Sequence, residues 1–202
     1  MPWVNVDVVA MNSKLREFHE AGFAVLPEVS SEELVLLRHF LTEKFVAIMR
    51  RNSIDFETIV PSRNITDYHL SAYQIDHESV WVKNSRLLSS ADIDFFLKSF
   101  SFIDRLRSII GDFEIADIEG LGRPEIYWRL ARPGGLDLAP AHKDSWFWAL
   151  TNNLKPEEQA GLAKVWIPVF TDIDESGLSV VPGSHRLDLP FGVEIRHGRP
   201  KP

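Results

Sequence analysis

A histidine and an aspartate stand two positions apart at the start of the most aromatic segment of the chain. His142 and Asp144 are followed by Trp146 and Trp148 in the sequence AHKDSWFW. In a β-strand successive side chains alternate between faces, so an imidazole and a carboxylate at this spacing point the same way. If the strand continues, both tryptophans share that face, which is then the interior of a sandwich or barrel. A divalent cation would compensate both buried polar groups at once.

The same spacing also has a purely structural explanation. A pair in a surface turn, or a His–Asp hydrogen bond that closes a strand end, would produce it without a metal, and His-x-Asp alone is weak evidence. The chain contains no cysteine, which excludes disulfides, thiolate zinc sites and a cysteine nucleophile. Any metal must therefore be held by nitrogen and oxygen ligands.

Length and charge limit the classes of protein that this chain can belong to. Its 202 residues, 45% of them hydrophobic, are enough for one domain with a real core. The formal charge of −7, with acidic and basic residues interspersed, argues against a nucleic-acid partner. No apolar run reaches the roughly 18 residues of a membrane span, and the amino terminus lacks signal-peptide order. We expect a cytoplasmic protein with no membrane partner.

The first part of the chain, residues 1–111, predicts helices. Asn12 or Ser13 can cap a short helix ended by Gly22, before a brief apolar strand at 23–27. The capping box Ser30-x-x-Glu33 precedes a long amphipathic helix over about 31–52.

Between this helix and Gly111 the pattern is less regular. Residues 53–90 are predicted to be irregular and polar, and the stretch 62–76, with Tyr68, His69 and Tyr73, is a candidate lid. Residues 91–110 predict one or two further helices that stop at Gly111.

From residue 112 onward the pattern changes to strands and turns. Short apolar runs rich in β-branched and aromatic residues alternate with Gly, Pro and Asp clusters. Helices and strands should pack as one domain over 1–202, with the helices covering a sheet. The expected strands are 113–118, 125–131, 141–150, 164–171, 178–181 and 193–196.

Three motifs in a fixed order carry a family resemblance. Residues 164–186 give a strand, an acidic turn, a second strand and a Pro-Gly turn that ends in Ser184-His185. The His142-x-Asp144 motif stands upstream, and the segment EFHEAGFAVLPEVSSEEL (17–34) opens the pattern. From about residue 15 to about 187 the chain resembles the phytanoyl-CoA dioxygenase-like family of Fe(II)/2-oxoglutarate-dependent oxygenases.

The resemblance implies an α+β fold in which a double-stranded β-helix, a cupin-like jelly-roll barrel, has amino-terminal helices packed on one side. It implies a metal held by two histidines and one carboxylate. His142 and Asp144 match the first two ligands of this set, with Fe(II) as the metal and 2-oxoglutarate and O2 as cosubstrates. Halogenating relatives have alanine at the carboxylate position, so Asp144 favours hydroxylation of a small-molecule substrate.

The end of the chain departs from the family pattern. The family places a third histidine ligand on a later strand and, about ten residues on, an arginine that pairs with 2-oxoglutarate. His197 is the only histidine after the Pro-Gly-Ser-His turn, so it is the candidate third ligand, with Arg199 as a candidate anchor. His197-Gly-Arg-Pro also fits an exposed loop. About six strands are predicted where a closed jelly roll takes about eight, so the barrel should be incomplete at its carboxyl end.

Three further residues are candidates for cosubstrate binding. Tyr127 and Arg129 share one face of a predicted strand, and Arg129 could bind a carboxylate of 2-oxoglutarate or of the substrate. An ordinary ion pair with Asp112 or Glu114 would also explain it, and we expect that pairing in preference to a bound carboxylate. Trp166 stands where the family often packs an aromatic ring near the cosubstrate, although core packing also explains a strand tryptophan.

One remaining motif and two other functional readings complete the analysis. His185 in the Pro-Gly-Ser-His turn is interpreted as a structural histidine that hydrogen-bonds the neighbouring loop. Besides the oxygenase, the chain fits a non-catalytic jelly-roll binding module or a fragment of such an oxygenase. It also fits a cupin-like metal enzyme that does not use 2-oxoglutarate.

Overall fold

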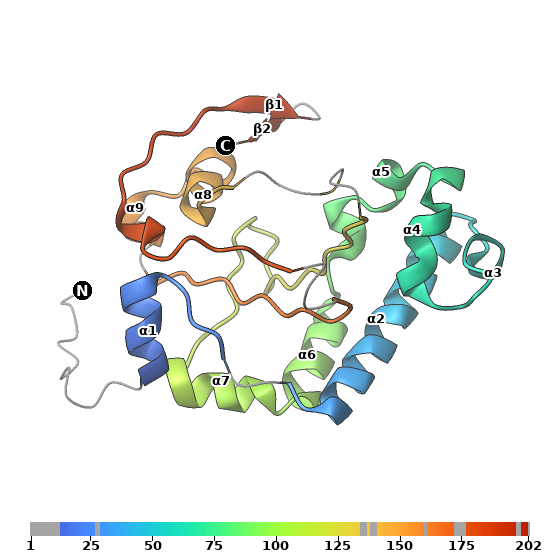
Figure 1. The fold of residues 1–202 in the computed structure, drawn as a ribbon, viewed down its shortest axis with the longest axis horizontal. Helices are drawn as coiled ribbons and strands as arrows, with labels where there is room; N and C mark the ends of the chain where they lie inside the picture. The colour runs from blue at the N-terminus through green and yellow to red at the C-terminus, as the bar shows by residue number, and fades with distance from the viewer. Residues whose placement is uncertain are drawn as a thin grey trace.

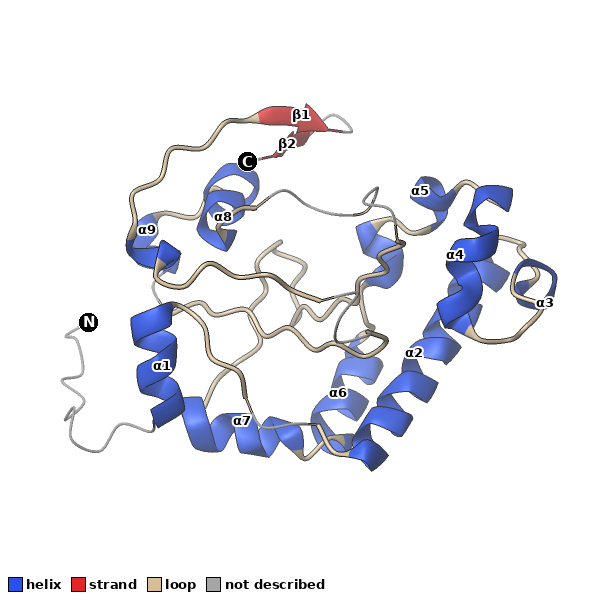
Figure 2. Cartoon of the chain, in the orientation of Figure 1, coloured by secondary structure: helices blue, strands red, loops and turns tan. Residues whose placement is uncertain are grey.

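Helices form the rim of the molecule and long extended segments cross its middle (Figures 1 and 2). The computed structural model describes residues 13–26, 29–133, 137, 141–159, 161–171, 177–196 and 199–201. The helices and strands are α1 (Ser13–Ala21), α2 (Ser31–Arg51), α3 (Phe56–Ile59), η2 (Ile65–Asp67), α4 (Tyr68–Ser71), η3 (Ala72–Gln74), α5 (His77–Val80), η4 (Lys83–Arg86), α6 (Ser90–Ser99), α7 (Phe102–Ile110), α8 (Asp144–Asn152), α9 (Pro156–Gln159), η5 (Ser184–Arg186), β1 (Glu194–Arg196) and β2 (Arg199–Lys201).

The amino-terminal helices confirm the sequence prediction. α1 is followed by Gly22, whose φ of 84° is the left-handed conformation that glycine adopts readily. α2 begins with the predicted capping box, in which Ser30 Oγ accepts from the Glu33 N–H and the Glu33 carboxylate accepts from the Ser30 N–H. The strand expected at 23–27 is not formed over 23–26, and Pro27 lies outside the described residues.

Glu33 does more than cap its own helix. Its carboxylate also accepts from the Phe102 N–H at 2.9 Å, the Ser101 hydroxyl at 2.9 Å and Arg105 Nη2 at 2.7 Å. Burial by itself would raise the pKa of this carboxyl, but these hydrogen bonds and the one from Ser30 outweigh burial and lower the pKa from 4.5 to about 2. One carboxylate therefore ties the start of α2 to the start of α7.

Two hydrophobic clusters form the core, and α2 contributes to both. The first cluster gathers around Phe45, Tyr68 and Trp81, and the second around Leu37, Phe96 and Phe100. Trp128 packs against both clusters. The prediction that residues 53–90 are irregular and polar was wrong. This stretch contains several short helices, and Val60, Tyr68 and Trp81 within it are buried.

The segment 125–131 has the alternation of a strand and lies against the helices. Ile126, Trp128 and Leu130 pack on the clusters, whereas Tyr127 and Arg129 are exposed on the other face. Leu87 forms an isolated antiparallel bridge with Tyr127, supported by bonds from the Leu88 N–H to the Ile126 carbonyl (2.9 Å) and from the Trp128 N–H to the Arg86 carbonyl (3.2 Å). This pairing is too short to count as a strand.

The other predicted strands have mixed outcomes. The strand expected at 193–196 corresponds to β1, which pairs antiparallel with β2. Residues 113–118, 164–171 and 178–181 form loops and turns without regular strand pairing (Figure 2). Within the described residues the one sheet is this two-stranded pair. The jelly-roll barrel, its incompleteness and the single-domain division at 111 therefore stay predictions.

The strand predicted at 141–150 was wrong, because Asp144–Asn152 is helix α8. The segment has no glycine or proline, and its only β-branched residue is Thr151, so nothing in its composition prevents a helix. Asp144 in the first turn interacts favourably with the helix dipole. Asn153 ends the helix in the left-handed conformation, with its N–H bonded to the Trp148 carbonyl.

Among the described residues, no helix is long and apolar enough to cross a membrane.

Lowering the pH should remove the stability that the Glu33 carboxylate contributes. The unfolded chain protonates this group near 4.5 and the folded protein only near 2, so in between the unfolded state binds more protons. The contribution is complete above about pH 4.5 and is lost as the pH falls toward about 2. At neutral pH, Glu33→Gln should unfold in urea more easily than the wild type by about 2–3 kcal/mol, and this difference should shrink over that acid range.

Glu32→Gln is the matched control, because Glu32 is exposed in the same helical turn. It should change the free energy of unfolding by less than about 0.5 kcal/mol. Equal effects of the two substitutions, or a Glu33→Gln difference that does not depend on pH, would contradict the role assigned to Glu33.

Candidate metal and cosubstrate site

His142 and Asp144 lie at the start of α8 rather than along a strand. His142 precedes the helix and is exposed, with its ring packed edge-on against Phe147 at a centroid distance of 4.7 Å. Asp144 is the first helical residue, and its carboxylate forms an ion pair with the Lys164 ammonium. The same-face argument for a strand therefore does not hold here.

The helix also separates the two tryptophans. Residues two positions apart in a helix point to opposite sides, so Trp146 and Trp148 cannot form the single aromatic wall that a strand would give. Trp146 instead stacks on Phe191 with a centroid distance of 4.7 Å. The Lys143 ammonium donates to the Leu187 carbonyl. These contacts attach α8 to the carboxyl-terminal segment.

The described residues do not form a complete iron site. Nowhere in the described part of the chain do three His, Asp or Glu side chains come together in a way that could hold a metal ion. His197, the candidate third ligand, lies outside the described residues. Two of the three predicted metal ligands, His142 and Asp144, are therefore among the described residues. The Lys164 ammonium already neutralises the Asp144 carboxylate.

The cosubstrate candidates come from three segments of the chain, and Tyr127 and Arg129 share one exposed face. Tyr127 is 42% exposed, and the Lys83 ammonium lies 4.9 Å from its ring centroid. Arg129 donates from Nη2 to the Asp137 carbonyl at 2.8 Å. Among the described residues it forms no ion pair, so the expected pairing with Asp112 or Glu114 was wrong. Trp166 is 42% exposed, and the backbone of Arg199 lies in β2 opposite Arg196.

His185 has the structural role that the sequence predicted, although its partner is the end of α1. Its Nε2 donates to the His19 carbonyl at 3.1 Å, and Arg186 Nη2 donates to the same oxygen at 2.7 Å. The His185 ring sits so close to Gly22 that a Cβ there would lie 2.3 Å from Nδ1. Glycine at 22 is therefore required both by its φ and by this ring.

Sequence reasoning missed a buried polar network around α4 and α5. The Trp81 indole N–H donates to the Tyr68 hydroxyl at 2.8 Å, and that hydroxyl donates to His77 Nδ1 at 2.8 Å. His77 Nε2 then faces Asp137 Oδ1 at 3.8 Å. Burial, followed by the charge of Arg132, lowers the pKa of His77, while Asp137 opposes this shift. The lowered pKa favours the neutral imidazole at pH 7.

Asp137 anchors the chain five residues before His142. Arg132 donates to its carboxylate through Nε at 2.7 Å, Nη2 at 2.8 Å and the backbone N–H at 2.8 Å. Hydrogen bonding from Arg132 holds the pKa of Asp137 below its usual value. In the sequence, the sign of this ion pair is an arginine and an aspartate on either side of Gly134-Gly135.

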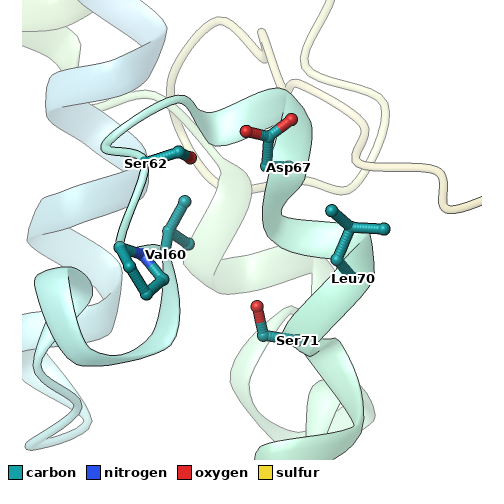
Figure 3. A pocket seen from close by; sticks show the side chains of 6 residues that line it. Val60, Ser62, Asp67, Leu70 and Ser71 are labelled. Carbon is teal, nitrogen blue, oxygen red and sulfur yellow. The ribbon is translucent and has the colours of Figure 1, made fainter.

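The candidate lid at 62–76 is partly core. Tyr68 is 1% exposed and Tyr73 is 83% exposed. A small pocket of about 230 Å³ opens here, lined by Val60, Pro61 and Ser62 after α3 and by Asp67, Leu70 and Ser71 from η2 and α4 (Figure 3). A lid function for the exposed residues of this stretch stays a prediction.

One comparison with known proteins shows the family of this chain. The phytanoyl-CoA dioxygenase family matches residues 18–194, a range that contains both His142 and Asp144. No curated protein and no solved structure matches the chain significantly. The chain belongs to the phytanoyl-CoA dioxygenase family, whose members are generally Fe(II)/2-oxoglutarate-dependent dioxygenases. The resemblance carried by the three motifs is thereby confirmed.

Tyr68→Phe should destabilise the protein although it removes a single oxygen atom. The change leaves the Trp81 indole N–H and His77 Nδ1 without their shared partner in a buried environment. The expected loss is about 2–3 kcal/mol in the free energy of unfolding, measured with urea. Tyr73→Phe, at an exposed position in the same stretch, should change it by less than about 0.5 kcal/mol. Similar values for the two variants would show that the network contributes no stability.

Lys164→Gln should tighten the binding of a divalent cation. The substitution removes the ammonium that competes for the Asp144 carboxylate. An exposed ion pair is worth up to about 1 kcal/mol, so the expected gain is at most about fivefold, measured by calorimetry with Mn(II) as a redox-stable probe. Lys155→Gln is the control, because Lys155 is exposed and has no ion pair among the described residues. An unchanged affinity, or an equal gain in both variants, would exclude direct competition at Asp144.

Proposed function

We propose that this protein is an Fe(II)/2-oxoglutarate-dependent dioxygenase that hydroxylates a small molecule. In this reaction one oxygen atom of O2 enters the substrate as a hydroxyl group. The other oxidises 2-oxoglutarate, which loses CO2 and becomes succinate. The family match over residues 18–194 is the observation that carries the proposal, because this range includes the His142-x-Asp144 motif.

In this proposal His142 and Asp144 are two of the three protein ligands, and His197 is the third. Two features of the described residues support the first pair. Asp144 already holds a positively charged partner, so its surroundings accept a cation. His142 is an exposed residue directly before α8, so it lies at the protein surface. When bound, Fe(II) would supply the redox chemistry with O2.

The residues around this pair then have specific tasks. Lys164 has to leave Asp144 before a metal binds there, which its 45% exposed side chain permits. Arg132 fixes Asp137, which stands five residues before His142 in the sequence. Arg129 presents its guanidinium on the exposed face of its segment, where it is available to a carboxylate of 2-oxoglutarate or of the substrate.

A non-catalytic binding module is the second candidate, and one observation favours it. The Asp144–Lys164 ion pair satisfies the carboxylate without a metal. A protein that had lost its metal would keep the His-x-Asp motif in this neutralised form. Such a module would have no affinity for Fe(II) and no response to 2-oxoglutarate.

An anaerobic titration of the protein with Fe(II) and then 2-oxoglutarate distinguishes these functions. The oxygenase should develop a weak visible charge-transfer band only when both are present, because 2-oxoglutarate chelates iron in this class. His142→Ala should abolish the band, since it removes a proposed ligand. His39→Ala should leave it intact, because His39 is exposed on α2 and pairs with Glu43.

The other outcomes each point to a different function. No band and no metal affinity would contradict the oxygenase and favour the binding module. Metal binding without any response to 2-oxoglutarate would favour a metal enzyme that uses another cosubstrate or none. If the band forms, its loss in His197→Ala identifies the third ligand.

A further inference from the structure

A second concave site lies on the helical side of the molecule, away from His142 and Asp144. It is a pocket of about 260 Å³ between the carboxyl-terminal half of α2, the segment 84–89 and Arg123. Trp128 is the last residue along the chain among its described lining residues. The pocket therefore shares no wall with the start of α8.

Positive charge dominates this pocket. Lys44, Arg51 and Arg123 line it together with a single carboxylate, Asp92. Three positive charges and one negative charge leave a formal charge of +2 around the opening, in a chain whose net charge is −7. A concave positive site on an acidic protein concentrates anions locally.

The one carboxylate is fully occupied by other groups. Asp92 Oδ1 pairs with the Lys44 ammonium, and Oδ2 accepts from the Ser89 N–H at 3.2 Å and the Ser89 hydroxyl at 2.8 Å. This capping interaction at the start of α6 leaves Asp92 no further role in the pocket. It does not neutralise the two arginines.

Both guanidinium groups keep donors available. Arg123 donates from Nη1 to the Leu88 carbonyl, which fixes one end of its fork and leaves the rest of the guanidinium available. Arg51 is exposed, and among the described residues its guanidinium forms no hydrogen bond or ion pair. The two arginines come from separate segments, α2 and the turn after residue 120.

The remaining wall of the pocket is mixed, with polar Asn84, Ser85 and Ser89 beside an apolar part that includes Ile48, Leu88 and Trp128. Ile48 belongs to the first hydrophobic cluster, Leu88 to the second, and Trp128 packs against both. A ligand in this pocket would therefore contact side chains of both clusters. Its charged group would meet the arginines, and a small carbon skeleton would meet Ile48, Leu88 and Trp128.

We propose that this pocket binds a small organic phosphate. A guanidinium fork binds two oxygens of one anion, so a single carboxylate is satisfied by one arginine. A phosphate monoester has three free oxygens and nearly two negative charges at neutral pH, and so matches two arginines and the local charge of +2. The apolar part of the wall, which includes Trp128, accommodates the carbon part of the ester.

Calorimetry at low salt, with no metal added, tests this proposal on the whole protein. Phenyl phosphate should bind saturably and more tightly than inorganic phosphate, because its ring contacts the apolar wall. Succinate, a dicarboxylate of similar charge, should bind more weakly than either. Arg51→Gln should weaken phenyl phosphate binding by about fivefold or more, since it removes a charged hydrogen-bond donor.

Arg50→Gln is the matched control, because Arg50 is the exposed neighbour of Arg51 on α2 and does not line the pocket. It removes the same charge and should leave the affinity within about twofold of the wild type. Equal losses in both variants, the absence of saturable phosphate binding, or tighter binding of succinate would each overturn the proposal. Because the pocket requires no iron, failure here would not affect the proposed oxygenase activity.

Discussion

The burial of Trp128 between two hydrophobic clusters is the contact on which most of this architecture depends. α2 supplies Leu37 to one cluster and Phe45 to the other, and the indole packs against both. This contact decides which face of the segment 125–131 meets the helices. Tyr127 and Arg129 are consequently presented on the opposite face, where a cosubstrate could reach them. Without the Trp128 contact, nothing would fix which face of this segment carries the polar residues.

The helices with strong local signals were predictable, because a cap and its partner lie within one turn of each other. The Ser30–Glu33 box and the left-handed Gly22 are of this kind. The core around Tyr68 was not predictable, because helices of three or four residues are too short to show a hydrophobic period. For α8 the aromatic composition suggested a strand, whereas Asp144 in the first turn and the presence of a single β-branched residue, Thr151, allow a helix.

The candidate site shows the same division between local and distant information. His142 and Asp144 could be found from their spacing and from the motifs around them. Lys164 could not, since it stands 20 residues further along the chain and meets Asp144 only in the folded protein. The contribution of Glu33 to α7 was hidden for the same reason, as Phe102 is 69 residues away. Sequence patterns reveal the residues that can do chemistry, and tertiary contacts decide what neutralises them.

Asp137 and Asp144 differ in the strength of their ion pairs. Asp137 accepts two side-chain bonds and one backbone bond from Arg132, whose side chain is 17% exposed. A bidentate, partly buried pair of this kind is strong and rigid. Asp144 has a single ammonium partner that is 45% exposed, and exposed lysine pairs contribute about 0–1 kcal/mol. A divalent cation can therefore displace the partner of Asp144 far more easily than that of Asp137. The Arg132–Asp137 pair is therefore a structural contact, whereas the pair at the proposed metal ligand Asp144 is the one that a cation could displace.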